Sequence, residues 1–94
     1  DCSGLVWYAY HHAGLNIPRT TGTLYTAGRA VPADRLQPGD LVFFRIGPGL
    51  VSHVGIYAGQ SRMIHAPRPG APVREESLQT GYWQKHYVGA RRLL

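Results

Sequence analysis

The sequence predicts an α+β domain in which a small antiparallel β-sheet packs against one helix. Apolar residues recur at helical spacing over residues 2–13. Residues 41–44 form a continuous apolar run with the length of a strand that is buried on both faces. Residues 52–58 alternate between two faces, and a hairpin-like turn and a returning strand follow them. Together these segments predict one helix followed by several short strands.

The first helix is expected to begin at Cys2, with Asp1 or a preceding residue as its cap, and to end before Gly14. A thiol in the first turn lies near free backbone N–H groups and the positive end of the helix dipole. Both favour the thiolate, which is the nucleophilic form of cysteine. The face that we expect to pack on the sheet contains Cys2, Leu5, Val6, Ala9 and Ala13.

Turn and strand signals predict the remaining elements. Thr20 or Thr21 can cap a short second helix that runs to about Ala27, and Gly28 ends it. The later elements are a single turn at 33–35, a tight turn at 38–39, a hairpin turn at 59–61, a strand at 62–66, an irregular proline loop at 67–72, a short strand around 73, a helical turn at 78–83 and a closing strand at 87–94.

Composition restricts the partners of this protein. Its 94 residues make one domain, and a hydrophobic content of 44% indicates a folded globule. The net charge of +5 suits an acidic polymer or surface, and nucleic acid, an anionic membrane and the bacterial cell wall all qualify. The basic residues are scattered, without a basic run interleaved with aromatic residues, so we expect no nucleic-acid partner. There is no apolar span for a membrane, and the single cysteine excludes an internal disulfide framework.

Two histidines in the predicted hairpin complete a candidate catalytic group. Gly59 lies midway between His53 and His65, so a turn there places the two imidazoles opposite each other on neighbouring strands. Directly opposed residues have Cβ atoms about 4.5–5.5 Å apart. Cys2 would then be the nucleophile, His53 the base that accepts its proton, and His65 the residue that orients His53. We expect Cys2 and His53 to form a thiolate–imidazolium pair.

The histidines and aromatic residues also allow other interpretations. A metal site made of Cys2, His53 and His65 is disfavoured, because structural zinc takes four ligands, usually in closely spaced pairs. We interpret the other histidines, His11, His12 and His86, as solvated. We interpret the aromatic residues as core rather than as carbohydrate-stacking groups; they are Trp7, Tyr8, Tyr10 and Trp83.

Five motifs in this order resemble those of the NlpC-type cell-wall cysteine peptidases, a papain-like family. They are Asp1-Cys2-Ser3-Gly4-Leu5-Val6, Leu15-Asn16-Ile17-Pro18-Arg19-Thr20-Thr21, Gly39-Asp40-Leu41-Val42-Phe43-Phe44, His53-Val54-Gly55-Ile56-Tyr57 and Ile64-His65-Ala66. The tail from Tyr82 to Arg92 resembles the enterobacterial outer-membrane lipoprotein branch. The resemblance implies a papain-like fold in which the helix that carries the nucleophile packs against the sheet.

The resemblance also implies an activity and a location. It implies hydrolysis of peptidoglycan stem peptides between γ-D-glutamate and diaminopimelate, with Cys2, His53 and His65 as the catalytic residues. Asp1 and Ser3 would bind the free amine of the L-alanine in the stem peptide. No cofactor and no metal are expected. The protein would be a monomer that is periplasmic or secreted, or anchored as an outer-membrane lipoprotein in its full-length form.

Two departures from the family and two rival functions are part of this interpretation. Residues 1–94 are expected to be a single NlpC-type catalytic domain that lacks the upstream helix and loop of family members, including a tyrosine near the oxyanion site. Thr23-Leu24-Tyr25 stand where relatives often carry glutamines.

One rival function is a Cys–His acyltransferase, but such relatives typically place histidine before cysteine. The other is an inactive cell-wall binding module, which the intact set of Cys2, His53 and His65 disfavours.

Overall fold

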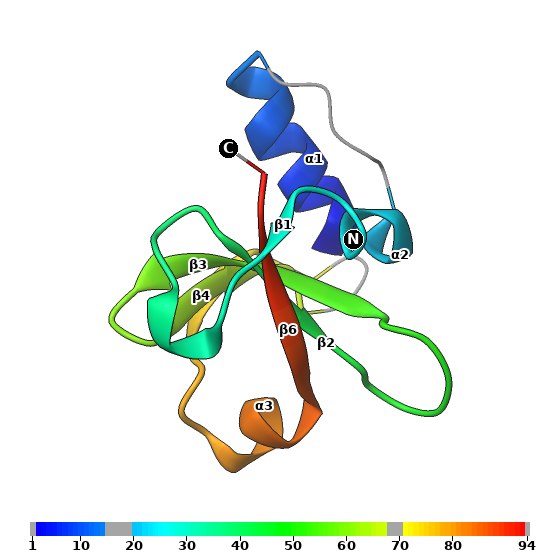
Figure 1. Cartoon of the computed structure of the whole chain (residues 1–94), viewed down its shortest axis with the longest axis vertical. Helices are drawn as coiled ribbons and strands as arrows, with labels where there is room; N and C mark the ends of the chain where they lie inside the picture. Colours follow the sequence, from blue (N-terminus) through cyan, green and yellow to red (C-terminus); the bar gives the residue numbers. More distant parts are fainter. Residues whose placement is uncertain (1, 15–19, 68–70, 94) are drawn as a thin grey trace.

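The computed structural model describes residues 2–14, 20–67 and 71–93, with the side chains of Cys2 and Ser3 left out, and its centre is an antiparallel sheet (Figure 1). In chain order, the elements are α1 (Cys2–His12), α2 (Thr21–Leu24), β1 (Arg29–Ala30), the 3-10 turn η1 (Ala33–Arg35), β2 (Leu41–Phe44), β3 (His53–Gly59), β4 (Arg62–His65), β5 (Arg74–Ser77), α3 (Gly81–His86) and β6 (Tyr87–Arg92). In this described part of the chain, no helix is long and apolar enough to cross a membrane.

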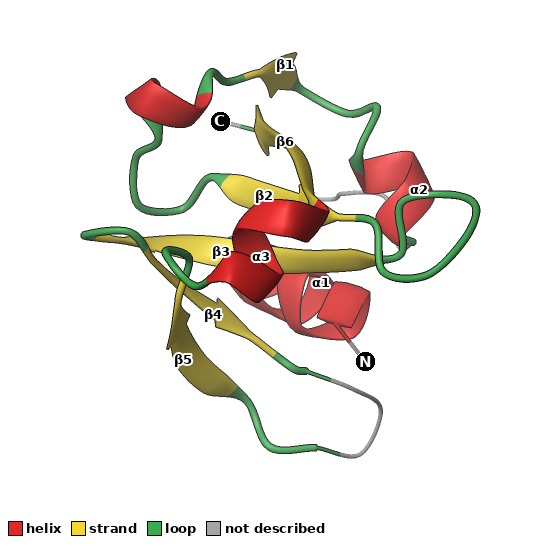
Figure 2. Ribbon diagram, turned by 90° about the horizontal axis from the view of Figure 1, so that it is seen from below, coloured by secondary structure: helices red, strands yellow, loops and turns green. Residues whose placement is uncertain are grey.

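The six strands have the spatial order β1-β6-β2-β3-β4-β5, and every neighbouring pair is antiparallel. The predicted α+β fold with a small antiparallel sheet is therefore confirmed. All four residues of β2 are buried, as a strand covered on both faces requires. Figure 2 shows α3 in front of the sheet and α1 behind it, so helices cover both faces.

Each face of the sheet has its own apolar cluster. The cluster beneath α1 contains Val6, Tyr10, Leu24, Leu41, Phe43 and Val54. The cluster beneath α3 contains Val31, Val42, Phe44, Met63, Trp83 and Ala90. The alternation of β2 and β3 places odd and even residues in different clusters, because successive side chains of a strand point to opposite faces.

The first helix has its predicted bounds, but its buried face differs. Gly14 has a φ of +81° and donates its N–H to the carbonyl of His11 at 3.0 Å, which confirms the glycine cap. The prediction that Ala9 and Ala13 are buried is wrong, since both are exposed. Tyr10 is buried instead, because its long side chain reaches the sheet and its hydroxyl donates to the Gly39 carbonyl at 2.6 Å.

Smaller differences occur at four other places. The interpretation of Tyr8 as core is wrong, because this residue is 58% exposed. α2 is shorter than predicted, although Thr20 caps it by accepting from the Thr23 N–H. α3 begins three residues later than predicted, after its cap Thr80. β1 was not predicted, because its two residues become a strand only by pairing with β6.

The register of the β3–β4 hairpin differs from the predicted one. Gly59 pairs with Arg62, and Gln60 and Ser61 form the turn with φ values of 54° and 58°, which fit a type I′ turn. Ile56 pairs with Ile64, so the ladder places His65 beside Gly55 rather than opposite His53. The prediction of direct opposition is therefore wrong. A shift of two residues keeps both histidines on one face, because the side-chain period is two.

A buried ion pair ties the last strand to the loop before β2. The Asp40 carboxylate accepts from Arg92 Nε at 2.8 Å, from Arg92 Nη2 at 2.8 Å and from the Gln37 N–H at 2.9 Å. Asp40 is only 2% exposed. The Arg92 hydrogen bonds, against the opposing effect of burial, hold the pKa of Asp40 below its ordinary value of 3.8.

We predict that Asp40→Asn lowers the free energy of unfolding by roughly 1.5–3 kcal/mol at pH 7, because hydrogen bonds to a charged group are lost. A carboxyl whose pKa is lower in the folded chain stabilises the fold above the unfolded pKa, and this contribution disappears as the pH falls through the folded pKa. Urea unfolding should therefore show a difference from wild type that shrinks below about pH 4. Asp34→Asn, at an exposed position of η1, is the control and should have little effect. A difference that is equal at pH 7 and pH 3 would contradict this account.

We predict that Gly55→Ala destabilises the fold by about 1–3 kcal/mol, the usual cost of overfilling a packed site. A Cβ at Gly55 would lie 2.8 Å from Met63 Sδ and 3.4 Å from His65 Cβ, and both neighbours are fully buried. Gly22→Ala is the matched control, since a Cβ there meets nothing within 4 Å. Denaturant unfolding and the imidazole NMR signals of both variants provide the measurement. Unchanged stability and signals in Gly55→Ala would show that the space beside His65 is not restricted.

Candidate active site

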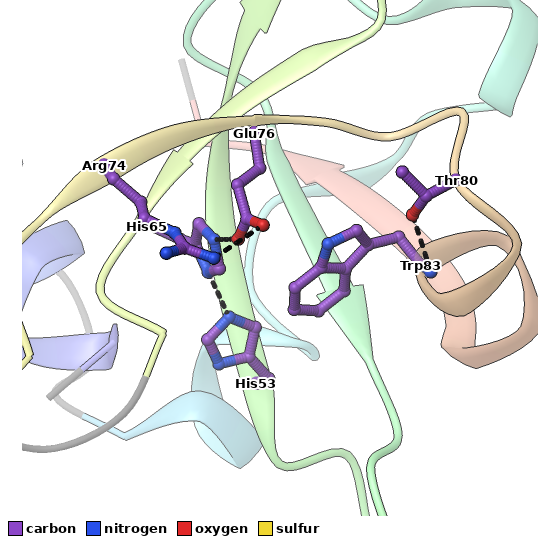
Figure 3. A network of polar contacts seen from close by, with 6 residues as sticks. All are labelled: His53, His65, Arg74, Glu76, Thr80 and Trp83. Atoms are coloured by element: carbon purple, nitrogen blue, oxygen red, sulfur yellow. Dashed lines mark hydrogen bonds and ion pairs between the residues drawn. The ribbon is translucent and has the colours of Figure 1, made fainter.

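Two imidazoles meet on the face of the sheet that α3 covers. His53 begins β3 and His65 ends β4, and His53 Nε2 lies 2.8 Å from His65 Nδ1 (Figure 3). His53 is 5% exposed and His65 is fully buried. The expected contact between the two rings is present, although it joins diagonal neighbours, which long and aromatic side chains can bridge. The catalytic role of the pair stays a prediction at this point.

A carboxylate that the sequence did not predict continues this contact. Glu76 of β5 hydrogen-bonds His65 Nε2 through Oε2, and Arg74 Nη2 donates to Glu76 Oε1 at 2.9 Å. Burial raises the pKa of Glu76, but the hydrogen bonds from Arg74 and His65 outweigh it and leave that pKa below its ordinary value. The carboxylate is therefore ionised at neutral pH. Its only sequence signal was its place in the short strand expected around residue 73.

The surroundings of His53 favour the neutral imidazole. Burial, followed by the neighbouring His65, lowers the pKa of His53 to about 4, against a smaller opposing effect of the Glu76 charge. A neutral ring at pH 7 can accept a proton, which is what a general base must do. The described neighbours of His53 thus favour a base that is uncharged before the reaction rather than a preformed imidazolium.

Trp83 shields the pair from solvent. Its ring stacks on His53 with centroids 5.5 Å apart and planes at 23°, and it forms a T-shaped contact with His65, with centroids 5.1 Å apart and planes at 88°. The indole is 8% exposed, as expected for a core aromatic. Thr80 positions it from the start of α3 by accepting from the Trp83 N–H at 3.4 Å (Figure 3). Exclusion of water by this ring contributes to the low pKa of His53.

The proposed nucleophile and substrate-binding residues are only partly within the described structure. Asp1 lies outside the described residues, and so do the side chains of Cys2 and Ser3. The backbone of Cys2 begins α1, as predicted, and α1 packs against β3, the strand that begins at His53. The helix that begins at Cys2 and the strand that begins at His53 are therefore direct neighbours.

The remaining histidines belong to other parts of the structure. His11 and His12 are exposed on α1, where Trp7 stacks on His11 and the Tyr8 ring contacts His12 at a tilt. His86, which we interpreted as solvated, is half-buried, and its Nδ1 hydrogen-bonds the Arg45 carbonyl at 2.9 Å in an exposed contact. Both ring nitrogens of His65 have hydrogen-bond partners, so His65 offers a metal no free lone pair in this arrangement.

Comparison of this sequence with known proteins finds the same family by a family model and by individual relatives. The model of the NlpC/P60 family matches residues 1–92. Murein DD-endopeptidase MepH of Escherichia coli K12 is 49% identical over 98 residues, which cover 100% of this chain and 36% of that protein. Gamma-D-glutamyl-L-lysine dipeptidyl-peptidase of Bacillus cereus is 43% identical over 96 residues, which cover 100% of this chain and 29% of that protein. The chain thus spans about a third of the length of these relatives.

Solved structures agree with the sequence matches. A crystal structure of an NlpC/P60 family protein from Bacillus cereus superposes with a TM-score of 0.92 and 43% identity, covering 100% of this chain and 32% of that one. RipD from Mycobacterium tuberculosis, described as a non-catalytic NlpC/p60 domain protein adapted to peptidoglycan binding, has a TM-score of 0.80 and 33% identity, covering 100% of this chain and 67% of that one. The resemblance expected from the five motifs is therefore confirmed, and the chain belongs to the NlpC/P60 family.

Proposed function

We propose that this chain is the catalytic domain of a cysteine endopeptidase that hydrolyses peptidoglycan stem peptides. Cys2 is the nucleophile, His53 is the general base and His65 orients His53. The observation that carries the proposal is the buried His53, which hydrogen-bonds His65 and lies on the strand against which the Cys2 helix packs. The endopeptidase and dipeptidyl-peptidase names of relatives support the same chemistry.

The proposed reaction follows the steps of acyl transfer through a thioester. His53 takes the proton of the Cys2 thiol, and the sulfur attacks the carbonyl carbon of the scissile peptide bond. The backbone N–H of Cys2, at the start of α1, donates to the oxyanion. His53 then gives its proton to the leaving amine. In the second half of the reaction, His53 takes a proton from water, and the water oxygen attacks the thioester carbonyl carbon. The C–S bond then breaks, the carboxylic acid leaves, and His53 returns the proton to the Cys2 sulfur.

The bond that we propose lies between γ-D-glutamate and diaminopimelate, with Asp1 and Ser3 binding the free amine of L-alanine. A relative named for γ-D-glutamyl-L-lysine supports this bond, whereas the name of MepH specifies a DD-endopeptidase. The two bonds release different fragments, so mass spectrometry separates them. We further propose that the protein acts as a monomer in the periplasm or outside the cell, or as an outer-membrane-anchored lipoprotein in its full-length form.

Peptidoglycan binding without hydrolysis is the second candidate, because RipD has this fold and is described as non-catalytic. The presence of Cys2, His53 and His65 together disfavours it. Binding to purified cell walls, measured in parallel with hydrolysis, distinguishes the two functions.

We predict that the protein releases fragments from purified muropeptides, and that Cys2→Ala and His53→Ala each slow the release by about a thousandfold or more. His12→Ala, which removes an exposed imidazole of α1, is the control and should retain activity. Mass spectrometry of the muropeptides provides the measurement. Wild-type protein that binds cell walls but releases no fragment would reject the proposed hydrolysis in favour of the binding function.

We predict that kcat/KM stays high well below pH 6.5 and that its acid limb lies near pH 4. A general base works only when unprotonated, and the low pKa of His53 extends that range to lower pH. Trp83→Leu should move the acid limb upward, because it admits water to His53. Tyr8→Leu, at an exposed ring, is the control. An acid limb at pH 6.5 or above in the wild-type enzyme would contradict this assignment.

A further inference from the structure

We propose that Glu76 is a positioning residue, which sets through His65 the nitrogen of His53 that carries the proton and thereby leaves His53 Nδ1 free to act as the base. The proposal rests on the role of His53 given above. It adds a fourth residue to the site, and it assigns to Arg74 the task of holding the Glu76 carboxylate.

The three side chains lie on one diagonal line across three neighbouring strands. His53 is on β3, His65 on β4 and Glu76 on β5 (Figure 3). In the β4–β5 ladder, His65 pairs with Arg74 and Met63 pairs with Glu76, so Glu76 is a diagonal neighbour of His65. His65 is likewise a diagonal neighbour of His53. Each step of the line is closed by a hydrogen bond.

The direction of these hydrogen bonds follows from the chemistry of the last partner. An ionised carboxylate can only accept, so His65 must donate its Nε2–H to Glu76. In a neutral imidazole, the other nitrogen is then an acceptor, and His65 Nδ1 accepts from His53 Nε2–H. With its proton on Nε2, His53 has a free lone pair on Nδ1. A proton from the nucleophile can therefore be received at Nδ1 and at no other atom of this ring.

Arg74 keeps the Glu76 carboxylate, the last group of the line, ionised and able to accept a hydrogen bond. Its Nη2 donates to Glu76 Oε1, while Glu76 Oε2 faces His65. These contacts leave the carboxylate ionised and fix which oxygen faces the imidazole. The side chain of Glu76 is 24% exposed, and that of Arg74 is 61% exposed, so the line runs from the buried pair to the surface.

Substitution by glutamine tests this arrangement sharply. Arg74 would continue to hold Oε1 of the amide, so the amide NH2 would face His65 Nε2. An amide NH2 only donates. His65 Nε2 would then become the acceptor, His65 Nδ1–H would donate to His53 Nε2, and the proton of His53 would move to Nδ1. This isosteric substitution thus reverses the direction of both hydrogen bonds, and His53 Nδ1 can no longer accept a proton.

Nitrogen NMR of histidine-labelled protein without substrate reports the tautomers directly. In the wild type at pH 7, we expect both His53 and His65 to carry their protons on Nε2. In Glu76→Gln, we expect both rings to carry them on Nδ1, and kcat/KM on muropeptides to fall between about a hundredfold and ten-thousandfold, since a wrong tautomer has a cost of this order. Glu75→Gln is the matched control, because Glu75 pairs with Arg62 at the surface and should leave both readouts unchanged.

Two further results keep the test decisive. Glu76→Ala, which removes the acceptor without supplying a donor, should give mixed tautomers and an intermediate loss, and it serves as the second variant if Glu76→Gln unfolds. Wild-type tautomers in both Glu76 variants, with kcat/KM within about twofold of wild type, would overturn the proposal.

The NMR result does not depend on turnover. A reversal of tautomers in a protein that hydrolyses nothing would retain the role of Glu76 and reject the proposed function, whereas unchanged tautomers in an active enzyme would do the opposite.

Discussion

The hydrogen bond between His53 and His65 is the interaction on which the rest of this site depends. Two imidazoles that are buried together need a partner for each N–H, and burial lowers the pKa of His53. Neighbouring groups meet these requirements in different ways. Gly55 leaves room beside His65, Trp83 covers both rings, and Glu76 accepts the outermost proton. In the proposed function, these contacts make His53 a buried proton acceptor whose tautomer is fixed.

The sheet uses one face for packing against α1 and the other face for the two histidines. One face of β2 and β3 packs beneath α1 in an apolar cluster, and the other face carries the histidines beneath α3. Because α1 packs on the face of β3 opposite the imidazoles, it contacts this strand without occupying the face that holds them. The Asp40–Arg92 ion pair joins the loop before β2 to β6, and so stabilises the strands at the centre of this arrangement.

Most of the fold could be predicted from local patterns, and so could the histidine contact. The apolar run of β2, the glycine after α1 and the alternation in β3 are signals that neighbouring residues provide by themselves. The histidine contact survived an error of register because residues two positions apart share a face. The sheet face of the two histidines was thus predictable, but their cross-strand partners were not. The partners depend on whether the turn is centred on Gly59 or lies between Gln60 and Ser61, as it does here.

Glu76 could not be found in this way, and the reason is the connection between β4 and β5. A two-residue turn restricts the register of a hairpin, but the longer proline-containing connection before Arg74 leaves several registers open. Once the pairing of His65 with Arg74 is known, the alternation of β5 places Glu76 on the histidine face and Glu75 on the other. The contact of His65 with Glu76 then repeats the diagonal step from His53 to His65. The pairing of β4 with β5 therefore decides whether a carboxylate continues the line of hydrogen bonds beyond His53 and His65, and no local sequence pattern contains that pairing.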